Sequence, residues 1–263
     1  MVDPVRRGHA TAPSAAAQAD TLWADRLDRK SLEGAIAAWK QAVASADDDA
    51  RSWLMLARAQ YFLGDGFLDL EHADNDLVTQ TFEDGATFAD RGLRALSPTY
   101  EERRHDGLEV DEAAAGLGPE VVPFIYWWGL NAIRWADRKG WTAAARVYKH
   151  VLRCMEIVAA LDPGFDHAGA ERYFGAFYSA APGLAGGDTD KGKTNIDRAL
   201  ARSPEYLGTW VVLADRYAKK VGDHALYEKA RQHVLDTPSE AVPDSVPEQE
   251  IAKKKARMLA PHL

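Results

Sequence analysis

Residues 204–238, PEYLGTWVVLADRYAKKVGDHALYEKARQHVLDTP, show the fold of the chain most clearly. The prolines at the two ends stand 34 residues apart, and apolar residues recur between them every three or four positions. This spacing is typical of amphipathic α-helices, and Gly222 with Asp223 supplies a turn between two of them. The stretch therefore predicts a helical hairpin whose second helix runs from about Ala225 to Leu235.

The same pattern recurs along the rest of the chain. Within the first helix of this hairpin, a tryptophan, a leucine, a small residue and a tyrosine have the spacing of a tetratricopeptide repeat. Proline or aspartate residues that end the second helices occur at positions 47, 98, 163, 204 and 238. These positions predict five hairpins followed by a C-terminal capping helix over about 248–259. The expected fold is all-α, a tetratricopeptide-like solenoid in which each hairpin packs against its neighbours.

Insertions interrupt the 34-residue period at three places. The two long ones, residues 64–81 and 99–120, are expected to form loops on one face, which is often the binding face of a repeat protein. The short one, the glycine-rich elbow GLAGG, lacks the Walker pattern and follows a helix. It predicts a turn in which Gly186 and Gly187 take positive φ, and in which Asp188 caps the next helix.

The domain organisation follows from the same frame. Residues 1–17 are expected to be a disordered or processed N-terminal segment, and residues 18–263 a single tetratricopeptide-like helical domain. Residues 1–20 lack the apolar core of a signal peptide. The longest nearly apolar run, residues 121–130, is too short to cross a membrane.

Composition and charge narrow the classes of function. The chain has 40 acidic and 32 basic residues and a net charge of −8, which argues against a nucleic-acid partner. It has a single cysteine, Cys154, so no internal disulfide can form. That usage fits the cytosol and also a periplasmic protein without disulfides.

Motifs for catalysis or metal binding are not apparent in the sequence. It lacks the nucleophile elbow and the zinc-protease pattern, and we expect no enzymatic activity and no cofactor. Two pairs at helical spacing, His150 with Cys154 and His167 with Glu171, each lack a third metal ligand. The acidic run at 69–76 lacks the spacing of a calcium-binding loop. We predict no catalytic residues and no metal site.

Aromatic residues concentrate in the first helices of two neighbouring hairpins. The stretch 124–141 is apolar around most of the helix, so it must bury more than one side. Packing between hairpins accounts for some of these residues, and the surplus predicts an apolar pocket in which a few polar groups orient a ligand. The candidate ligand-binding residues are Phe124, Trp127, Trp128, Asn131, Trp135, Tyr173, Phe174, Phe177 and Tyr178.

Residues 173–238 resemble the TRAP transporter T-component (TatT) family of bacterial periplasmic or lipid-anchored helical-repeat proteins. The resemblance is carried by PGLAGGDTDKG at 182–192, NIDRALARSP at 195–204 and the run at 207–238. The C-terminal EQEIAKKKARMLA at 248–260 is similar to the closing helix of that family.

This resemblance implies assembly with a periplasmic substrate-binding protein and a cavity for an apolar ligand. A related helical-repeat protein serves in bacterial sterol trafficking. The resemblance also implies a periplasmic location, with outer-membrane association through a lipid anchor that the sequence as given does not carry; a cytoplasmic location stays open. Members of the family can be trimeric, so a homo-oligomer also stays open.

Two functions follow as alternatives. The first is a non-enzymatic periplasmic transport component that holds an apolar small molecule, such as a sterol or another lipid. Its cavity walls would come from residues 124–135 and 173–178, with the two long insertions as lids. The second is an adaptor that docks a periplasmic substrate-binding protein of a TRAP-type transporter through its concave face. A closed aromatic cavity favours the first function, and an open polar groove with exposed aromatic residues favours the second.

Overall fold

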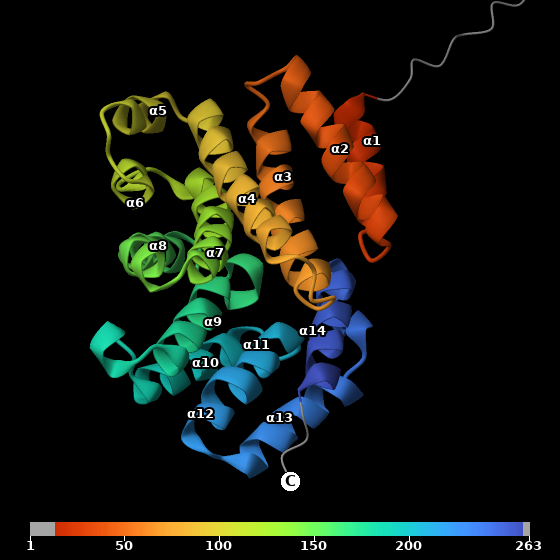
Figure 1. Ribbon diagram of the computed structural model, residues 1–263, viewed down its shortest axis with the longest axis vertical. Coiled ribbons are helices and arrows are strands. Elements are labelled where there is room, and N and C mark those ends of the chain that lie inside the picture. The colour runs from red at the N-terminus through yellow and green to blue at the C-terminus, as the bar shows by residue number, and fades with distance from the viewer. Residues whose placement is uncertain (1–13, 260–263) are drawn as a thin grey trace, which may run out of the picture.

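The computed structural model describes residues 14–259, which are mostly helical and contain no strand (Figure 1). The all-α prediction is therefore confirmed. The long helices follow one another in pairs, which is consistent with five hairpins. The pairs are α1 (Ala15–Ala24) with α2 (Arg29–Ser45), α3 (Ala50–Leu63) with α4 (Asn75–Leu96), α7 (Val122–Lys139) with α8 (Trp141–Leu161), α9 (Phe165–Ala180) with α10 (Thr189–Arg202), and α11 (Leu207–Val212) with α13 (His224–Asp236).

Short polar side chains fix where the helices begin. Asp188 accepts hydrogen bonds from the backbone amides of Asp190 and Lys191 at 3.1 and 3.0 Å, as expected for the cap of α10. Gly186 takes the expected positive φ of 89°, whereas Gly187 has a negative φ, so the expectation for that residue is wrong. Ser14 caps α1 in the same way, and this helix begins at Ala15. Residues 1–13 of the predicted N-terminal segment lie outside the described residues.

Both long insertions are largely helical, with short turns between the helices, and the expectation of loops is wrong for most of their residues. The first continues α3 as a π-helix, Gly64–Leu68, and α4 begins at Asn75. A side chain at Gly64 would overlap the Phe82 ring, with 2.6 Å between its Cβ and the ring, so glycine lets the two helices pack closely here. The second insertion forms α5 (Pro98–His105) and α6 (Val110–Ala114), which pack against α4 and α8. A cap at Ser97 and a capping box at Glu109 explain these two short helices.

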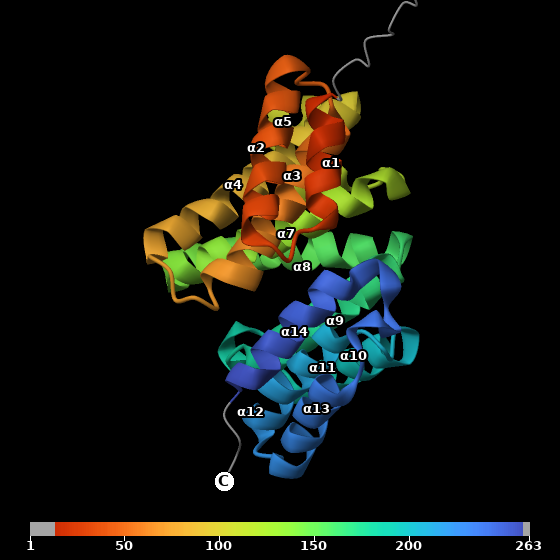
Figure 2. The same cartoon turned by 90° about the vertical axis from the view of Figure 1, so that its right-hand side faces the viewer.

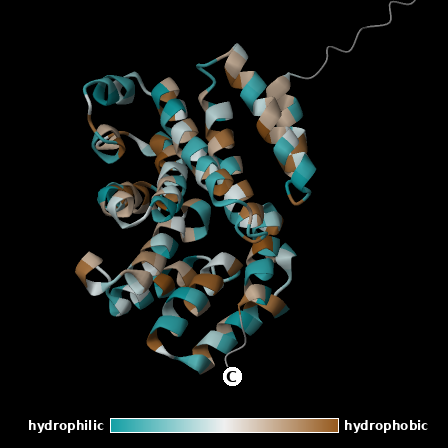
Figure 3. Ribbon diagram, in the orientation of Figure 1, coloured by the Kyte–Doolittle hydropathy of each residue, from teal (hydrophilic) through white to brown (hydrophobic). Residues whose placement is uncertain are grey.

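The hairpins form two groups. Helices α1 to α8 occupy the upper part of Figure 1, and α9 to α14 (Val246–Met258) occupy the lower part. The largest buried cluster lies in the upper group and continues into α9 through Ala170, Tyr173 and Phe174, whereas a separate cluster lies within α10 to α13. The helices carry hydrophobic and hydrophilic residues on different sides (Figure 3). The groups meet where α9 contacts α7 and α8 and where α14 reaches the first two hairpins. The site described below lies between these helices.

The last helix, α14, makes polar contacts with both groups of helices. It lies beside α11 and α13, where the buried Gln249 donates to the carbonyl of Glu205 and accepts from the amide of Leu207. Its first turn also reaches the upper group (Figure 2), because Glu248 pairs with Arg26 at 2.7 Å and with Arg58 at 3.0 Å. Helix α14 therefore ties the last hairpin to the first two.

Candidate ligand-binding cavity

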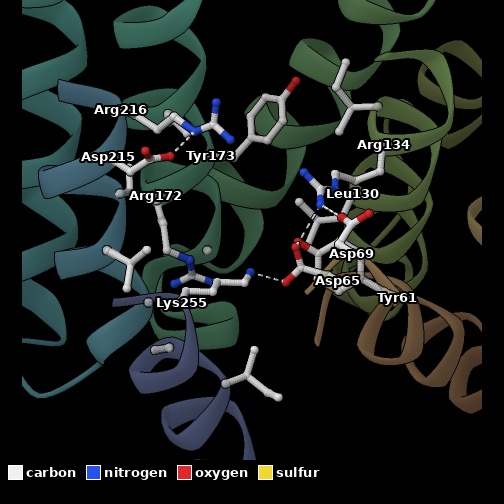
Figure 4. A pocket seen from close by; sticks show the side chains of 18 of the residues that line it. Tyr61, Asp65, Asp69, Leu130, Arg134, Arg172, Tyr173, Asp215, Arg216 and Lys255 are labelled. Atoms are coloured by element: carbon white, nitrogen blue, oxygen red, sulfur yellow. Dashed lines mark hydrogen bonds and ion pairs between the residues drawn. The ribbon is translucent and has the colours of Figure 1, made fainter. Parts of the chain in front are cut away.

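A cavity of about 660 Å³ lies between the two groups of helices (Figure 4). Its walls come from α3 with its π-helical extension, α7, α8 through Tyr148, α9, α11 with its own extension, and α14. Cavities of this volume are typical of sites that bury a small organic molecule.

One part of the wall is apolar and rich in aromatic rings. Trp127 on α7 is 8% exposed, and its ring packs edge-on against Tyr126 and at a tilt against Tyr61, with centroids 5.1 and 5.6 Å apart. Larger aliphatic and phenyl side chains of the wall come from α3, α7, α9, α11, α14 and the turn after the π-helix. They are Phe62, Leu70, Leu130, Ile133, Phe177, Val211, Val212, Ile251, Met258 and Leu259.

A second part of the wall is an ion-pair network between α7, the π-helix after α3, and α14. Arg134 lies between Asp65 and Asp69, and Lys255 pairs with Asp65 from α14 (Figure 4). Arg138, which does not line the cavity, also pairs with Asp69. Burial acts to raise the pKa of Asp65, but Lys255 and Arg134 outweigh it and hold that pKa below its ordinary value. The carboxylate is therefore ionised at neutral pH and joins α14 to the upper group.

Two π-helical turns face the cavity from different sides. One is Gly64–Leu68, which carries Asp65, and the other is Leu213–Ala218, which carries Asp215 and Arg216. Figure 4 shows these side chains on separate walls of the same space. Short π-helical turns are rare and occur frequently at functional sites, because the wider turn re-aims the side chains it carries.

A left-handed turn forms the start of α9. Asp166, His167 and Ala168 have φ angles of 48°, 57° and 60°, although none of them is glycine. Left-handed backbone costs about 1–2 kcal/mol per such residue, so the surroundings must hold it in place. Arg172 does so by donating to the carbonyl oxygens of Asp166 and His167, both at 3.0 Å.

The same arginine links this turn to α7. Its Nη2 donates to the Asp166 carboxylate at 2.6 Å and to the Tyr126 hydroxyl at 2.9 Å, and that hydroxyl donates to Asp166 at 2.6 Å. The guanidinium also lies over the ring of Tyr206, 4.5 Å from its centroid. Arg172, Asp166, Tyr126 and Tyr206 all line the cavity, so the strained turn is part of its wall.

The predicted site residues divide among several environments. Trp127, Tyr173 and Phe177 line the cavity. Phe174 and Tyr178 extend from the other side of α9 and line a shallow cleft beside α10.

The remaining four predicted residues do not line the cavity. Phe124 and Asn131 are buried against α4, where the Asn131 amide donates to the backbone carbonyls of Ala57 and Trp127. Trp128 is half-buried against the main core, and Trp135 packs on a smaller cluster around Phe82. Helix α7 buries most of its circumference in its neighbours, and only the Trp127 side is left for the cavity.

The charged residues of the wall were missed by the sequence analysis. Asp65 and Asp69 stand four residues apart, as do Arg134 and Arg138, so each pair shares a helix face. A run of charges on an otherwise apolar helix is the signal that could have identified them, because such charges need partners when they are buried. The partner from α14, Lys255, has no such local signal.

The residues considered as metal ligands have other partners. His150 lies 2.7 Å from Asp111, and His167 lies 2.9 Å from the hydroxyl of Ser245. Within residues 14–259, no group of three His, Cys, Asp or Glu side chains is arranged to hold a metal ion. In that same range, no helix is both long enough and apolar enough to cross a membrane.

Comparison with known proteins places the chain in a family. Among curated proteins, no sequence matches it. The profile of the TRAP transporter T-component family matches residues 56–263, a span that includes every residue lining the cavity. The match covers most of the sequence and agrees with the resemblance seen in its C-terminal part. The chain therefore belongs to the TRAP transporter T-component family.

Proposed function

We propose that this chain is a non-enzymatic component of a TRAP-type transport system that holds a largely apolar small molecule, of lipid or sterol size, in the cavity. The observation that carries the proposal is the cavity of about 660 Å³, whose wall combines aromatic and aliphatic side chains with a smaller number of charged groups. Such a combination buries an apolar body and orients a polar end.

The ion pairs made by the charged groups of the wall support a role in binding rather than in catalysis. Arg134, Arg172 and Lys255 each pair with a carboxylate of the wall. Groups already engaged in ion pairs stabilise the wall and are poorly placed to transfer protons. A periplasmic location, with a lipid anchor on the mature protein, fits the family and forms part of this proposal.

The first test is to identify the ligand. Protein purified from its native host is extracted with organic solvent, and the extract is analysed by mass spectrometry. We expect a lipid or sterol to be enriched over a control protein purified in parallel. If no such molecule co-purifies, and neither a fluorescent sterol nor a fluorescent fatty acid binds the purified chain, the proposal is wrong.

A matched pair of tryptophan substitutions tests the position of the site. Trp127→Ala removes an aromatic wall of the cavity, whereas Trp141→Ala removes a side chain that is 63% exposed and does not line it. We expect the first variant to bind the fluorescent ligand about tenfold more weakly, as for the loss of one aromatic contact of about 1.4 kcal/mol, and the second to bind normally. Equal affinities would place the ligand elsewhere.

Exposed apolar residues favour a second role, the docking of a periplasmic substrate-binding protein. Leu184 at the tip of the elbow is fully exposed, and the neighbouring Pro182 lines the cavity. A partner bound at this elbow would therefore lie close to the cavity and could receive its contents. Leu184→Ser should weaken co-elution with the substrate-binding protein of the same transporter while leaving ligand affinity unchanged, and unaltered co-elution would count against docking there.

A further inference from the structure

One part of the cavity wall joins a carboxylate to three aromatic rings. The Tyr148 hydroxyl on α8 donates to the Asp137 carboxylate on α7 at 3.0 Å. The Tyr148 ring packs edge-on against Phe177 on α9, with centroids 5.5 Å apart, and Phe177 lies parallel to Tyr173 at 6.4 Å. All four residues line the cavity. These contacts form a continuous corner, which we call the Asp137 corner.

Asp137 differs from the other carboxylates of the wall. Within residues 14–259 it is the one lining carboxylate that has no arginine, lysine or histidine within ion-pair distance. The two arginines near it along α7, Arg134 and Arg138, are both engaged by Asp69. The corner therefore presents to the cavity a carboxylate that has no direct ion-pair partner. The others, each with a cationic partner, are Asp65, Asp69, Asp166, Asp215 and Glu248.

A buried hydroxyl in the same corner also lacks a partner. Tyr173 is 9% exposed, and its Oη has no hydrogen-bond partner among the described residues. Burial raises the pKa of Tyr173 and the negative charge of Asp137 raises it further, so the phenol stays neutral. An unpaired buried hydroxyl is costly, and a ligand group that bonds to it would recover that cost.

We propose that the Asp137 corner binds the ammonium group of an amphipathic amine whose apolar part lies along Trp127 and Leu130. Aromatic faces attract cations, the carboxylate supplies the opposite charge, and the Tyr173 oxygen accepts a hydrogen bond from an N–H group. An anionic head group would be repelled by Asp137. This inference rests on the proposed function, since it names the class of molecule that the cavity holds.

Four probes of equal chain length separate the contributions of charge and hydrogen bonding. They are dodecylammonium, dodecyltrimethylammonium, dodecanol and dodecanoate, each titrated below its micelle concentration into the full chain. We expect both cations to bind about tenfold more tightly than dodecanoate, with the affinity of the alcohol in between, because the carboxylate and the three ring faces attract a cation and the carboxylate repels an anion.

Two substitutions in the Asp137 corner and one outside it test whether this corner causes the preference for cationic probes. Asp137→Asn should reduce the preference for cations over dodecanoate to about twofold or less. Tyr173→Phe should weaken dodecylammonium by about fivefold and leave dodecyltrimethylammonium unchanged, because the quaternary ion has no N–H to donate. Asp197→Asn removes an exposed carboxylate that pairs with Lys193 on α10, away from the cavity, and should change neither value.

The outcomes separate this inference from the proposed function. If all four probes bind with similar affinity, or if dodecanoate binds most tightly, the ammonium site is wrong and the apolar cavity stands. If the cations are preferred but Asp137→Asn keeps that preference, another carboxylate is responsible and the assignment to this corner is wrong. If none of the four probes binds while the variants remain folded, both the ammonium site and the proposed function lose their support.

Discussion

One side of α7 lies against α4 with almost no space between the helices, whereas another side borders a cavity of about 660 Å³. Against α4, Gly85 and Gly92 make room for Asn131 and Phe124, and a side chain at either glycine would overlap its neighbour. Towards the cavity, Arg134 reaches carboxylates on another element instead of packing on it. Small residues thus bring helices together, and long paired charges hold them apart.

The largest difference between the two sides should appear in a pair of truncations on α7. Phe124→Ala empties a well-packed position and should lower the free energy of unfolding by about 3–5 kcal/mol. Leu130→Ala enlarges a space that already exists, so we expect a loss of about 1 kcal/mol. Chemical denaturation of both variants checks the contrast, and equal losses would show that the cavity side is packed as tightly as the α4 side.

Breaking the charge network at the cavity should have the next largest effect. Arg172→Met leaves the Asp166 carboxylate, which is 14% exposed, without its guanidinium and leaves the left-handed turn without its donor. We expect a loss of about 3 kcal/mol in the free energy of unfolding. Arg29→Met, which breaks a pair with exposed side chains, serves as the control and should cost less than about 1 kcal/mol. A similar cost for both variants would contradict the role given to Arg172.

Filling the narrow gap between α4 and α7 should have a smaller cost. Gly85→Val places a branched side chain against the Asn131 amide, so the two helices must separate. The expected loss is about 2 kcal/mol, and Gly183→Ala, at a position with open space around it, should be neutral within about 0.5 kcal/mol. A stable Gly85→Val protein would mean that the interface can relax at little cost.

The smallest expected effect is a dependence of stability on pH. Burial lowers the pKa of His167 in the folded state below its ordinary value of 6.5, so the unfolded chain binds more protons as pH falls below 6.5. The contribution of His167 is complete above pH 6.5 and decreases as pH falls towards the folded pKa. Wild-type protein should therefore lose more stability between pH 7.5 and 5.5 than His167→Gln does, as measured by urea denaturation at each pH. Equal losses would exclude His167 as the source.

Features that depend on local sequence were predictable. The 3.6-residue periodicity gave the helices, and Asp188 and Gly186 take the cap and turn conformations expected of their residue types. The loops expected for the two insertions are helical because caps such as Ser97 stabilise short helices within them. Those caps are also local signals, but the 34-residue repeat pattern does not include them.

Features that depend on long-range contacts could not be predicted in this way. Asp65 and Lys255 meet although 190 residues separate them, and no periodicity reports such a pairing. Trp127, Tyr173 and Phe177 line the cavity, but helix geometry alone could not tell which neighbour each side of a helix would meet. Trp127 lines the cavity while Trp128, one position away, packs against the core.

The left-handed turn at 166–168 also bears on how this chain can change in evolution. Repeat proteins commonly gain or lose whole hairpins, because each junction is made by its own neighbours. The junction between α8 and α9 is different, since its conformation depends on Tyr126 of the preceding hairpin and Arg172 of the following one. We therefore expect a duplicated or deleted hairpin to be tolerated less well at this junction than at the others. The third and fourth hairpins would then be inherited as one unit.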